Sequence, residues 1–421
     1  MESNEKSSRI SGFYKMSLDQ RIGLVRSFSN LSDEDIANLN NAIDFSLADT
    51  MIENVIGVFE LPIGIAMNFV INGEDMLIPM ATEESSVVAA ASNAAKIARI
   101  HRGFTTEISD PLMIGQIQIL GVPDLPNAAK AIIDKKREIL AVANAQDKIL
   151  VDLGGGAKDV EVRILESSEQ KMLVAHLIVD VRDAMGANAV NTMVEALAPI
   201  FEELTGGHIR LKILSNLADK RIAKATAVFD KEKMGGEKHV DAFLESYQLA
   251  AIDPYRAATH NKGIMNGIDA VIIATGNDFR AIEAGAHAFA ARNGQYTSLT
   301  RYYKDPQGNL VGEIELPVAV GIVGGAGSIH PKAKFCKKVL EINSAKQLAE
   351  VIASVGLAQN FAAVFALSTV GIQKGHMSLH AKNIALMAGA SKEEIDKVAD
   401  QMIVEGKVRM DRAKEILAAM R

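Results

Sequence analysis

The sequence predicts an α+β fold in which a small domain is inserted into a larger domain of mixed helices and sheet. Apolar residues make up 48% of the 421 residues and charged residues 23%, a balance typical of a globular chain with a large buried core. The pattern of predicted strands and helices changes near residue 110 and again near residue 215. Between these points strands and helices do not alternate one by one, which argues against a doubly wound parallel sheet.

The chain before the insertion has the pattern of helices, a hairpin and a buried helix. Residues 17–50 show polar-faced helical spacing. An apolar run over 58–70 leads to Asn72-Gly73, which is a strong hairpin signal, and residues 76–80 form the return strand. Residues 82–99 then predict a helix that is apolar nearly all round and is therefore buried.

The inserted segment, residues 110–215, has the element order of a ferredoxin-like α+β domain. Alternating apolar residues predict its first strand, and a long helical stretch, two strands, a second helix and a short last strand follow. These elements are expected at 114–119, 128–144, 160–165, 173–181, 189–205 and 209–214. We therefore expect a compact small domain at this position.

After the insertion the chain resumes the large domain. The apolar run 270–274 predicts a strand that ends in a turn and opens a helix over 279–292. Residues 318–323 lead into a glycine-rich loop, and the chain is largely helical from residue 344 until Lys374-Gly375 breaks it. The expected units are the large domain over 1–109 and 216–372, the small domain over 110–215, and a helical C-terminal flap over 373–421.

The composition argues against several classes of protein. A net charge of −7 gives no sign of a nucleic-acid-binding surface. Cys336 is the single cysteine, so an intrachain disulfide is impossible, which suits a reducing compartment. The first six residues are polar, unlike a signal peptide, and the apolar stretch 361–367 is far too short to cross a bilayer. We expect a cytoplasmic protein with neither nucleic-acid nor membrane partners.

The run DAMGAN at residues 183–188 is the most informative segment of the chain. It connects the predicted strand 173–181 to a predicted helix. Small residues at such a junction let a ligand approach the backbone closely, and the amides at the start of the helix favour an anion or a polar group. The alternative is a tight turn capped by Asp183, which this segment alone would favour.

Three further segments allow both a functional and a plain structural interpretation. Glu83 and Glu84 are predicted in the first turn of a helix, where the helix dipole favours carboxylates, yet one of them would serve as a general acid. Lys262, in a predicted glycine-rich loop, is either solvated or held to stabilise an oxyanion. Asp278 is either a helix N-cap or a carboxylate that tunes a neighbouring Glu or Lys.

His376 lies four residues before His380, which is the spacing of a zinc-binding helix. Met377 stands where zinc hydrolases require Glu, so that interpretation fails and we expect no metal. His376 is either a polar surface residue or a proton donor carried by a mobile terminal segment. The glycine runs 154–156 and 324–327 match neither a P-loop nor a dinucleotide fingerprint, so each alone predicts a turn.

Taken together, these segments resemble the soluble class II form of the 3-hydroxy-3-methylglutaryl-coenzyme A (HMG-CoA) reductase family. The resemblance implies an NAD(P)H-dependent oxidoreductase of the mevalonate route to isoprenoids. It reduces HMG-CoA to mevalonate and coenzyme A through mevaldyl-CoA and mevaldehyde, or runs the reverse reaction. A coenzyme A-binding protein without hydride chemistry would show losses at the matching positions, and none is seen. The matching segments are 53–57, 82–84, 87–92, 183–188, 260–267, 275–278 and 375–377.

The resemblance implies that four residues carry the chemistry. Glu84 supplies a proton to the carbonyl of mevaldehyde, and Lys262 stabilises the oxyanion of the tetrahedral intermediate. Asp278 links these two side chains and controls their protonation. His376 protonates the departing coenzyme A thiolate, which prevents it from adding back to the aldehyde. A Glu-Lys-Asp cluster of this kind titrates as one unit.

The resemblance also implies binding residues and a partner. Ser86, Arg256 and Asn266 lie in segments that contact substrate in the family, whose large domain binds HMG-CoA and forms the dimer. Residues 53–57 match a motif at the dimer interface, so we expect a homodimer with active sites at that interface, and higher assemblies stay open. The cofactor residues implied in the small domain and the glycine loop are Asp183, Met185, Gly186, Ala187, Asn188, Gly324 and Gly325.

Asp147 bears on the choice of cofactor. It falls where some relatives place an acid on the adenosine ribose. A carboxylate there bonds the free 2′-hydroxyl and repels a 2′-phosphate, so the resemblance favours NAD(H), with NADP(H) as the second choice. An exposed loop aspartate without a role is the alternative interpretation.

Overall fold

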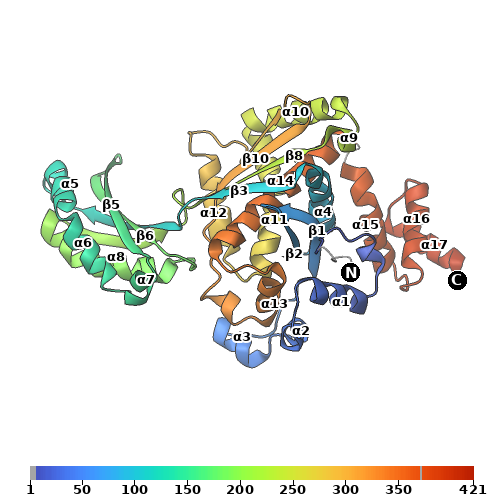
Figure 1. The fold of residues 1–421 in the computed structure, drawn as a ribbon, viewed down its shortest axis with the longest axis horizontal. Coiled ribbons are helices and arrows are strands. Elements are labelled where there is room, and N and C mark those ends of the chain that lie inside the picture. The colour runs from blue at the N-terminus through green and yellow to red at the C-terminus, as the bar shows by residue number, and fades with distance from the viewer. Residues whose placement is uncertain (1–5, 370–371) are drawn as a thin grey trace, which may run out of the picture.

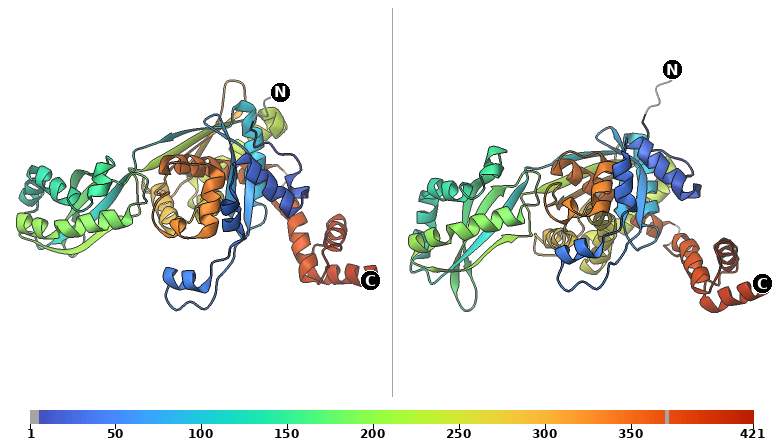
Figure 2. Two further views of the ribbon diagram at one scale, coloured as in Figure 1. Left: turned by 60° about the horizontal axis from the view of Figure 1, so that its bottom comes forward. Right: turned by 90° about the horizontal axis from the view of Figure 1, so that it is seen from below.

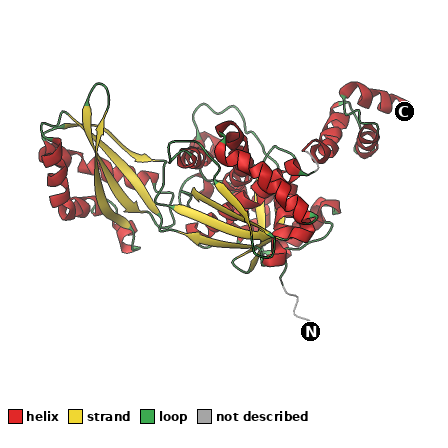
Figure 3. Cartoon of the chain, turned by 90° about the horizontal axis from the view of Figure 1, so that it is seen from above, coloured by secondary structure: helices red, strands yellow, loops and turns green. Residues whose placement is uncertain are grey.

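The structure is a computed structural model that describes residues 6–369 and 372–421. Its strands form two separate sheets, which are seen apart in Figure 3. The larger sheet has the order β2-β1-β3-β8-β10-β9 and is antiparallel except between β1 and β3. Its strands are β1 (Ile63–Ile71), β2 (Glu74–Ala81), β3 (Phe104–Ile108), β8 (Ile222–Phe229), β9 (Thr300–Lys304) and β10 (Leu310–Pro317). The predicted Asn72-Gly73 turn joins β1 to β2, with both residues at positive φ.

The helices of the large domain surround this sheet. The predicted helical region 17–50 forms three helices, of which the first two begin at capping boxes built on Ser17 and Ser32. Short 3-10 turns occur at Phe13–Lys15, Arg99–His101 and Ala326–Ser328. The helices are α1 (Leu18–Phe28), α2 (Asp33–Asn40), α3 (Phe45–Met51), α4 (Val87–Ala98), α9 (Lys231–Met234), α10 (Glu237–Ile252), α11 (Pro254–Ala274), α12 (Phe279–Ala290), α13 (Pro331–Leu340) and α14 (Ala345–Ser368).

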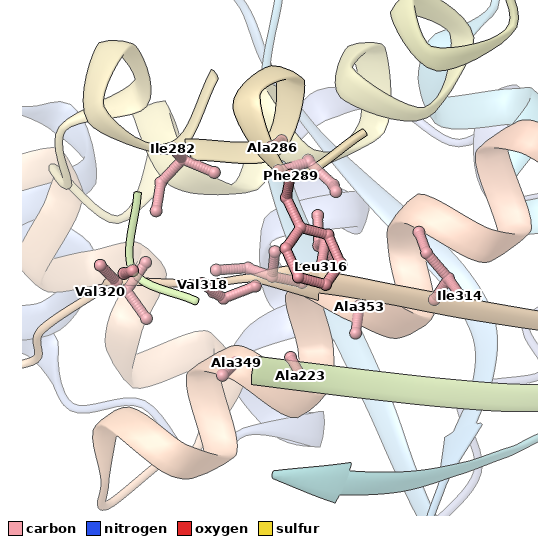
Figure 4. Close-up of a cluster of buried hydrophobic side chains, with 14 of the residues drawn as sticks. Ala223, Ile282, Ala286, Phe289, Ile314, Leu316, Val318, Val320, Ala349 and Ala353 are labelled. Carbon is pink, nitrogen blue, oxygen red and sulfur yellow. The ribbon is translucent and has the colours of Figure 1, made fainter. Parts of the chain in front are cut away.

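Helix α14 is the central helix of the large domain, where it packs against α11, α4 and β8. By length and composition α14 alone among the described helices would suffice to cross a bilayer, but 67% of its most apolar window is buried, as in the core helix of a globular protein. Figure 4 shows its Ala349 and Ala353 beside Leu316 of β10 and Phe289 of α12. The small alanine side chains let the helix approach the sheet closely.

The chain from β4 to β7 forms the second sheet, with the order β5-β6-β4-β7 and antiparallel neighbours throughout. Figure 1 shows this part standing to one side of the large domain, joined to it by the segments at 109–111 and 216–221. Helices α5, α6 and α8 pack against the sheet. The elements are β4 (Leu112–Leu120), α5 (Leu125–Asp134), α6 (Lys136–Asn144), α7 (Lys148–Asp152), β5 (Gly156–Glu166), β6 (Lys171–Asp180), α8 (Ala187–Thr205) and β7 (His208–Ser215).

The C-terminal helices form a small body of their own, which Figure 2 shows at the edge of the large domain. They are α15 (Ile372–Met387), α16 (Ile395–Val404) and α17 (Met410–Met420). Ala385, Val398 and Leu417 belong to a core that is separate from the main one. Because these helices bury their apolar faces against one another, they need few contacts with the rest of the chain.

Four local predictions were wrong. Residues 270–274 end helix α11 instead of forming a strand, because a short apolar run fits a buried helix equally well. Helix α4 begins at Val87, so the paired glutamates lie in the loop before it and not in its first turn. Lys262 lies inside helix α11 and not in a loop. Helix α15 runs without interruption through Lys374-Gly375.

Candidate active site

Several predicted residues line one cavity of about 720 Å³ in the large domain. The cavity lies between the loop before α4, the first half of α11 and the second half of α14. Alanine and phenylalanine side chains of α14 give it an apolar wall. A concave apolar site with a few convergent polar groups is the usual form of a small-molecule site. The predicted residues that line it are Glu84, Ser86, Arg256, Lys262 and Asn266.

The carboxylate of Glu84 is the point on which the polar side chains of this cavity converge. Lys262 Nζ lies 2.7 Å from Oε2, and Asn266 Nδ2 donates to Oε1 at 3.2 Å. Lys262 and Asn266 are four residues apart on α11 and therefore share one face of the helix. The side chains of Lys262 and Glu84 are 61% and 39% exposed, so the pair stays open to the cavity. This arrangement places a cation and an exchangeable proton beside any carbonyl bound there.

The loop that carries Glu84 is held by local contacts of its own residues. The backbone N–H of Glu84 donates to Thr82 Oγ1 at 3.2 Å. Ser86 adopts φ +75°, a left-handed conformation that is uncommon outside glycine, and α4 begins directly after it. Strained backbone of this kind often marks a functional site. It directs the chain so that Glu84 and Ser86 both face the cavity.

A buried polar network lies beneath the cavity, and sequence reasoning missed it. His260 Nε2 lies 2.7 Å from Thr300 Oγ1, which donates to Asn360 Oδ1. Burial lowers the pKa of His260 to about 3, so its imidazole stays neutral. Gln359 lines the same cavity, and in the described residues its buried Oε1 has no hydrogen-bond partner. The signal was present, because Gln359 and Asn360 interrupt the apolar second half of the helix, residues 355–367.

Asp278 does not join this cluster within the chain. It is the N-cap of α12, and its Oδ1 accepts from the backbone N–H groups of Arg280 at 3.0 Å and Ala281 at 3.2 Å. Twelve residues of α11 separate Lys262 from Ala274, which at 1.5 Å per residue is about 18 Å. Asp278 follows that end of the helix. One copy of the chain therefore keeps Asp278 away from the Glu84–Lys262 pair.

His376 belongs to helix α15, but its side chain lies outside the described residues. The backbone places it in the first part of the C-terminal body, after the end of α14. Its predicted role stays a prediction.

The DAMGAN turn joins β6 to α8. Gly186 is the N-cap of α8 at φ +102°, and no side chain caps the helix, so its first amides are free for a ligand. Met185, Ala187 and Asn188 flank this point. The residues present thus fit the diphosphate of a nicotinamide cofactor. Asp183 does not cap α8, because its Oδ1 accepts from the N–H of Ala345 at 2.8 Å.

The other predicted cofactor residues occupy two separate loops. Gly324 and Gly325 adopt φ +72° and +64° in the loop after residue 321. Asp147 is the N-cap of the short helix α7, where its Oδ1 accepts from the N–H of Leu150 at 2.9 Å. One oxygen of Asp147 thus serves as a helix cap, a role that the alternative interpretation of an exposed loop aspartate did not include.

The DAMGAN turn (residues 183–188), called the cofactor turn below after its predicted role, and Asp278 lie at the same end of α11. Gly321 donates its N–H to Asn277 Oδ1 at 2.8 Å, next to Asp278. A Cβ on Gly321 would lie 2.6 Å from the backbone nitrogen of Met185, so only glycine lets these segments touch. One copy of the chain thus gathers its cofactor turn and Asp278 at one end of α11. It holds its Glu84–Lys262 pair at the other.

A second cavity of about 680 Å³ adjoins the first and carries positive charge. Both cavities are lined by Asn93 and Phe365, so they lie next to each other, and we refer to the two together as the groove. Arg9, Lys96 and Lys233 line the second cavity, and in the described part of the chain none of them forms an ion pair. A groove that is apolar at one end and cationic at the other suits a long anionic ligand.

Comparisons with known proteins agree on one family. The sequence profile described as hydroxymethylglutaryl-coenzyme A reductase matches residues 17–381. The 3-hydroxy-3-methylglutaryl-coenzyme A reductase of Archaeoglobus fulgidus is 58% identical over 99% of this chain and 95% of its own length. A probable enzyme of the same name from Borreliella burgdorferi is 38% identical over 90% of this chain and 88% of its own length.

Solved structures give the same result. The 3-hydroxy-3-methylglutaryl-coenzyme A reductase of Streptococcus pneumoniae matches with a TM-score of 0.83 at 42% identity, covering 98% of this chain and 99% of that one. A second structure, described as the class II enzyme of that organism bound to NADPH in open conformations, matches with a TM-score of 0.81. It covers 96% of this chain and 100% of its own, at 42% identity.

Proposed function

The chain belongs to the hydroxymethylglutaryl-coenzyme A reductase family, and from this premise we propose how its own residues carry out the reduction. It is an oxidoreductase that uses a nicotinamide cofactor. When bound, that cofactor supplies hydride to the thioester carbonyl and then to the aldehyde. The observation that carries the proposal is the contact of Lys262 and Asn266 with Glu84 inside an apolar cavity.

The Glu84–Lys262 pair serves the two carbonyl reductions. Each hydride addition builds negative charge on the carbonyl oxygen, and the ammonium of Lys262 offsets that charge where the apolar wall keeps the dielectric low. Glu84 then delivers the proton that the second reduction requires. Asn266 holds the second oxygen of Glu84, which fixes the carboxylate plane relative to Lys262.

The groove accounts for the length of the substrate. We place the carboxylate of the 3-hydroxy-3-methylglutaryl group near Ser86 and Arg256, which line the catalytic cavity. Burial lowers the pKa of Arg256, but an arginine stays charged at neutral pH and pairs well with a carboxylate. The coenzyme A portion then extends past Phe365 toward Lys96 and Lys233, where its phosphates meet positive charge.

A homodimer completes the site in this proposal. The two halves of the predicted machinery lie at opposite ends of α11, so a second copy must bring Asp278 and the cofactor turn to the Glu84–Lys262 pair. The segment after α3 stands away from the body in Figure 2, with Ile56 97% and Phe59 89% exposed. An exposed apolar arm of this kind is suited to a subunit interface. It contains the predicted interface motif, residues 53–57.

His376 and Asp147 complete the proposal. His376 protonates the coenzyme A thiolate from the C-terminal body, which acts as a flap. The free oxygen of Asp147 bonds the adenosine ribose, which favours NAD(H) over NADP(H). The expected location of the enzyme is the cytoplasm.

Mixing two inactive variants tests the composite site. We expect Lys262→Ala and Asp278→Asn each to remove nearly all of the reducing activity as homodimers. After unfolding and refolding together, half of the dimers are mixed, and each mixed dimer holds one intact site if the halves come from different copies. Activity then returns to about a quarter of the wild-type value, given two equivalent sites in a C2 dimer. If all residues of a site came from one copy, no activity would return. The readout is HMG-CoA-dependent loss of NADH absorbance.

A further inference from the structure

Arg221 is a buried arginine on the second connection between the two domains, just before β8. Its side chain is only 4% exposed in the folded chain. Its Nη1 donates to the carbonyl oxygen of Ala184 at 3.1 Å and to that of Met185 at 3.3 Å. Its Nη2 donates to the carbonyl oxygen of Val320. One guanidinium thus joins the cofactor turn of the small domain to the strand extension that follows β10 in the large domain.

We propose that Arg221 is a positioning residue that sets the place of the cofactor turn for hydride transfer. The inference rests on the proposed function, because it takes the DAMGAN turn to be the cofactor site. No predicted role included Arg221. It lies 36 residues after Met185 in sequence, so only the folded chain brings the two together.

The electrostatics of Arg221 differ from those of an ordinary structural arginine. Arg99, for comparison, pairs with the carboxylate of Asp75 through two of its nitrogens. The hydrogen-bond acceptors of Arg221 in the described residues are all carbonyl oxygens, while Asp180 and Asp183 act on it only at a distance. Burial lowers the pKa of Arg221 to about 10, so it stays charged at neutral pH. A buried charge without a bonded carboxylate costs folding free energy, and its retention calls for another role.

The position of the Arg221 guanidinium suits an anionic cofactor. Met185, whose carbonyl oxygen Arg221 holds, immediately precedes Gly186, the N-cap of α8. The diphosphate expected at the free amides of this helix would therefore lie close to the guanidinium, in a setting where water screens little. Arg221 thus contributes its positive charge, and through the donors on Nη1 and Nη2 it also fixes the position of the turn.

Few other contacts hold the turn against the large domain. The N–H of Ile322 donates to the carbonyl oxygen of Asp183 at 2.9 Å, and the Asp183 carboxylate accepts from Ala345. Gly321 touches the turn but has no side chain to pack against it. A cavity of about 250 Å³ borders both Arg221 and Asp183, so no side-chain packing would replace the guanidinium. Loss of Arg221 should therefore let the turn shift.

A shift of the cofactor turn would change its position relative to Asp278. Val320, which Arg221 holds, is followed by Gly321, and the N–H of Gly321 donates to Asn277 beside Asp278. Arg221 therefore fixes the distance between the cofactor turn and the catalytic aspartate. It makes no contact with the cavity that holds the Glu84–Lys262 pair. Its loss is expected to affect the cofactor and to spare HMG-CoA binding.

The experiment compares Arg221→Met, which keeps the bulk, with Arg221→Lys, which keeps the charge without the fork. NADH and HMG-CoA affinities are each measured by titration of the full-length enzyme. We expect Arg221→Met to weaken NADH binding at least about tenfold and to lower kcat, because a charged buried hydrogen-bonding group is lost. The NADH affinity and kcat of Arg221→Lys should lie between those of the wild type and those of Arg221→Met. The HMG-CoA affinity should change less than about twofold in both variants. Val240→Ala, a core truncation in α10, serves as the control for lost stability and should change neither affinity.

Gly321→Ala provides a test that does not depend on the folding of the arginine variants. Its new Cβ would lie 2.6 Å from the backbone nitrogen of Met185 and would displace the turn, so the same loss of NADH affinity with HMG-CoA affinity spared is expected. Equal weakening of both ligands, or unchanged NADH affinity in Arg221→Met, would overturn the role of Arg221. A wild-type enzyme that binds neither NADH nor NADPH would overturn the proposed function itself.

Discussion

The two ends of helix α11 differ in how many of the predicted site residues already contact one another there. At one end Lys262 already contacts Glu84 at 2.7 Å inside a formed cavity. At the other end Asp278 caps α12 and the cofactor turn meets the chain beside it, and in the described residues neither forms a hydrogen bond to a residue that lines the Glu84–Lys262 cavity. In the proposed function the first end is one half of the active site, and the second end is the half that supplies the cofactor and a carboxylate.

If the proposed dimer forms, folding of one chain and assembly of the site are separate events. The Glu84–Lys262 end depends on local features, the loop before α4 and one face of α11. The Asp278 end depends on contacts between domains, through Arg221 and Gly321. Substitutions at the first end should therefore lower kcat while the cofactor affinity stays constant. Substitutions at the second end should change cofactor affinity as well.

The largest expected effect comes from Lys262→Ala. Removing the cation beside the developing oxyanion should lower kcat by about 10²–10³-fold, in the range seen for the loss of one oxyanion-stabilising group. NADH affinity, measured by titration, should stay unchanged because the turn lies at the other end of α11. The matched control is Lys135→Ala, which removes a lysine that also lies 2.7 Å from a glutamate, Glu138, but on the surface of the small domain. Loss of NADH affinity in Lys262→Ala would contradict the separation of the two ends.

His376→Gln should have the next largest effect. His376 belongs to neither end of α11, so its loss should differ in kind from the loss of residues at either end. Reduction of HMG-CoA should slow by about 10²-fold, the usual contribution of a general acid, because the thiolate is no longer protonated. Reduction of free mevaldehyde should continue at a near-normal rate, because that step releases no thiolate. Steady-state rates with each substrate are compared in the same preparation. An equal loss with both substrates would place His376 in carbonyl reduction instead.

The fold was predictable where the pattern of the sequence is local. The Asn72-Gly73 hairpin is observed as predicted, because this dipeptide fits the positive φ values of a tight turn. The run 270–274 was misread as a strand because five apolar residues carry too little periodicity to separate a strand from a buried helix. Lys262 was placed in a loop for a related reason, since the glycines around it weaken a helix signal.

The candidate site was predictable through resemblance and much less through pattern. Glu84 and Lys262 lie 178 positions apart, and nothing local in the sequence pairs them. Their contact arises because the β1–β2 hairpin returns the chain to α11, a tertiary effect. His260 and Arg221 were missed because burial alone makes them unusual, and burial depends on the whole fold. A polar residue inside an apolar run, such as Gln359, is the local pattern that indicates a buried polar group of this kind.

A smaller effect is expected at Asp147, in the cofactor half. Asp147→Asn keeps the N-cap of α7 and removes the charge, whereas Asp147→Ala removes both. Both variants should relax the proposed preference for NADH over NADPH several-fold, as judged by the ratio of kcat/KM values. Only Asp147→Ala should also lose about 1 kcal/mol of stability, the usual worth of an N-cap. An unchanged cofactor ratio in both variants would leave Asp147 with its capping role alone.

The smallest expected effect lies between the two ends, at Asp269 of α11. Burial and the neighbouring Glu283 raise the pKa of Asp269 to about 8, while His287 lowers that of Glu283 through an ion pair at 2.5 Å. The folded chain therefore keeps a proton on Asp269 that the unfolded chain, with a pKa near 3.8, releases. Stability must then fall as the pH rises from about 4 to about 8, since the folded state binds more protons across that window.

Asp269→Asn tests this directly, because an amide can donate at any pH the hydrogen bond that protonated Asp269 donates to Glu283. The melting temperature of the variant should change less between pH 5 and pH 8 than that of the wild type. The shift at Glu283 acts below its ordinary pKa of 4.5 and leaves this window unaffected. Parallel melting curves for the two proteins would show that Asp269 is ionised in the folded chain. A flatter curve together with unchanged kcat would show instead that the middle of α11 governs stability, while its two ends govern chemistry.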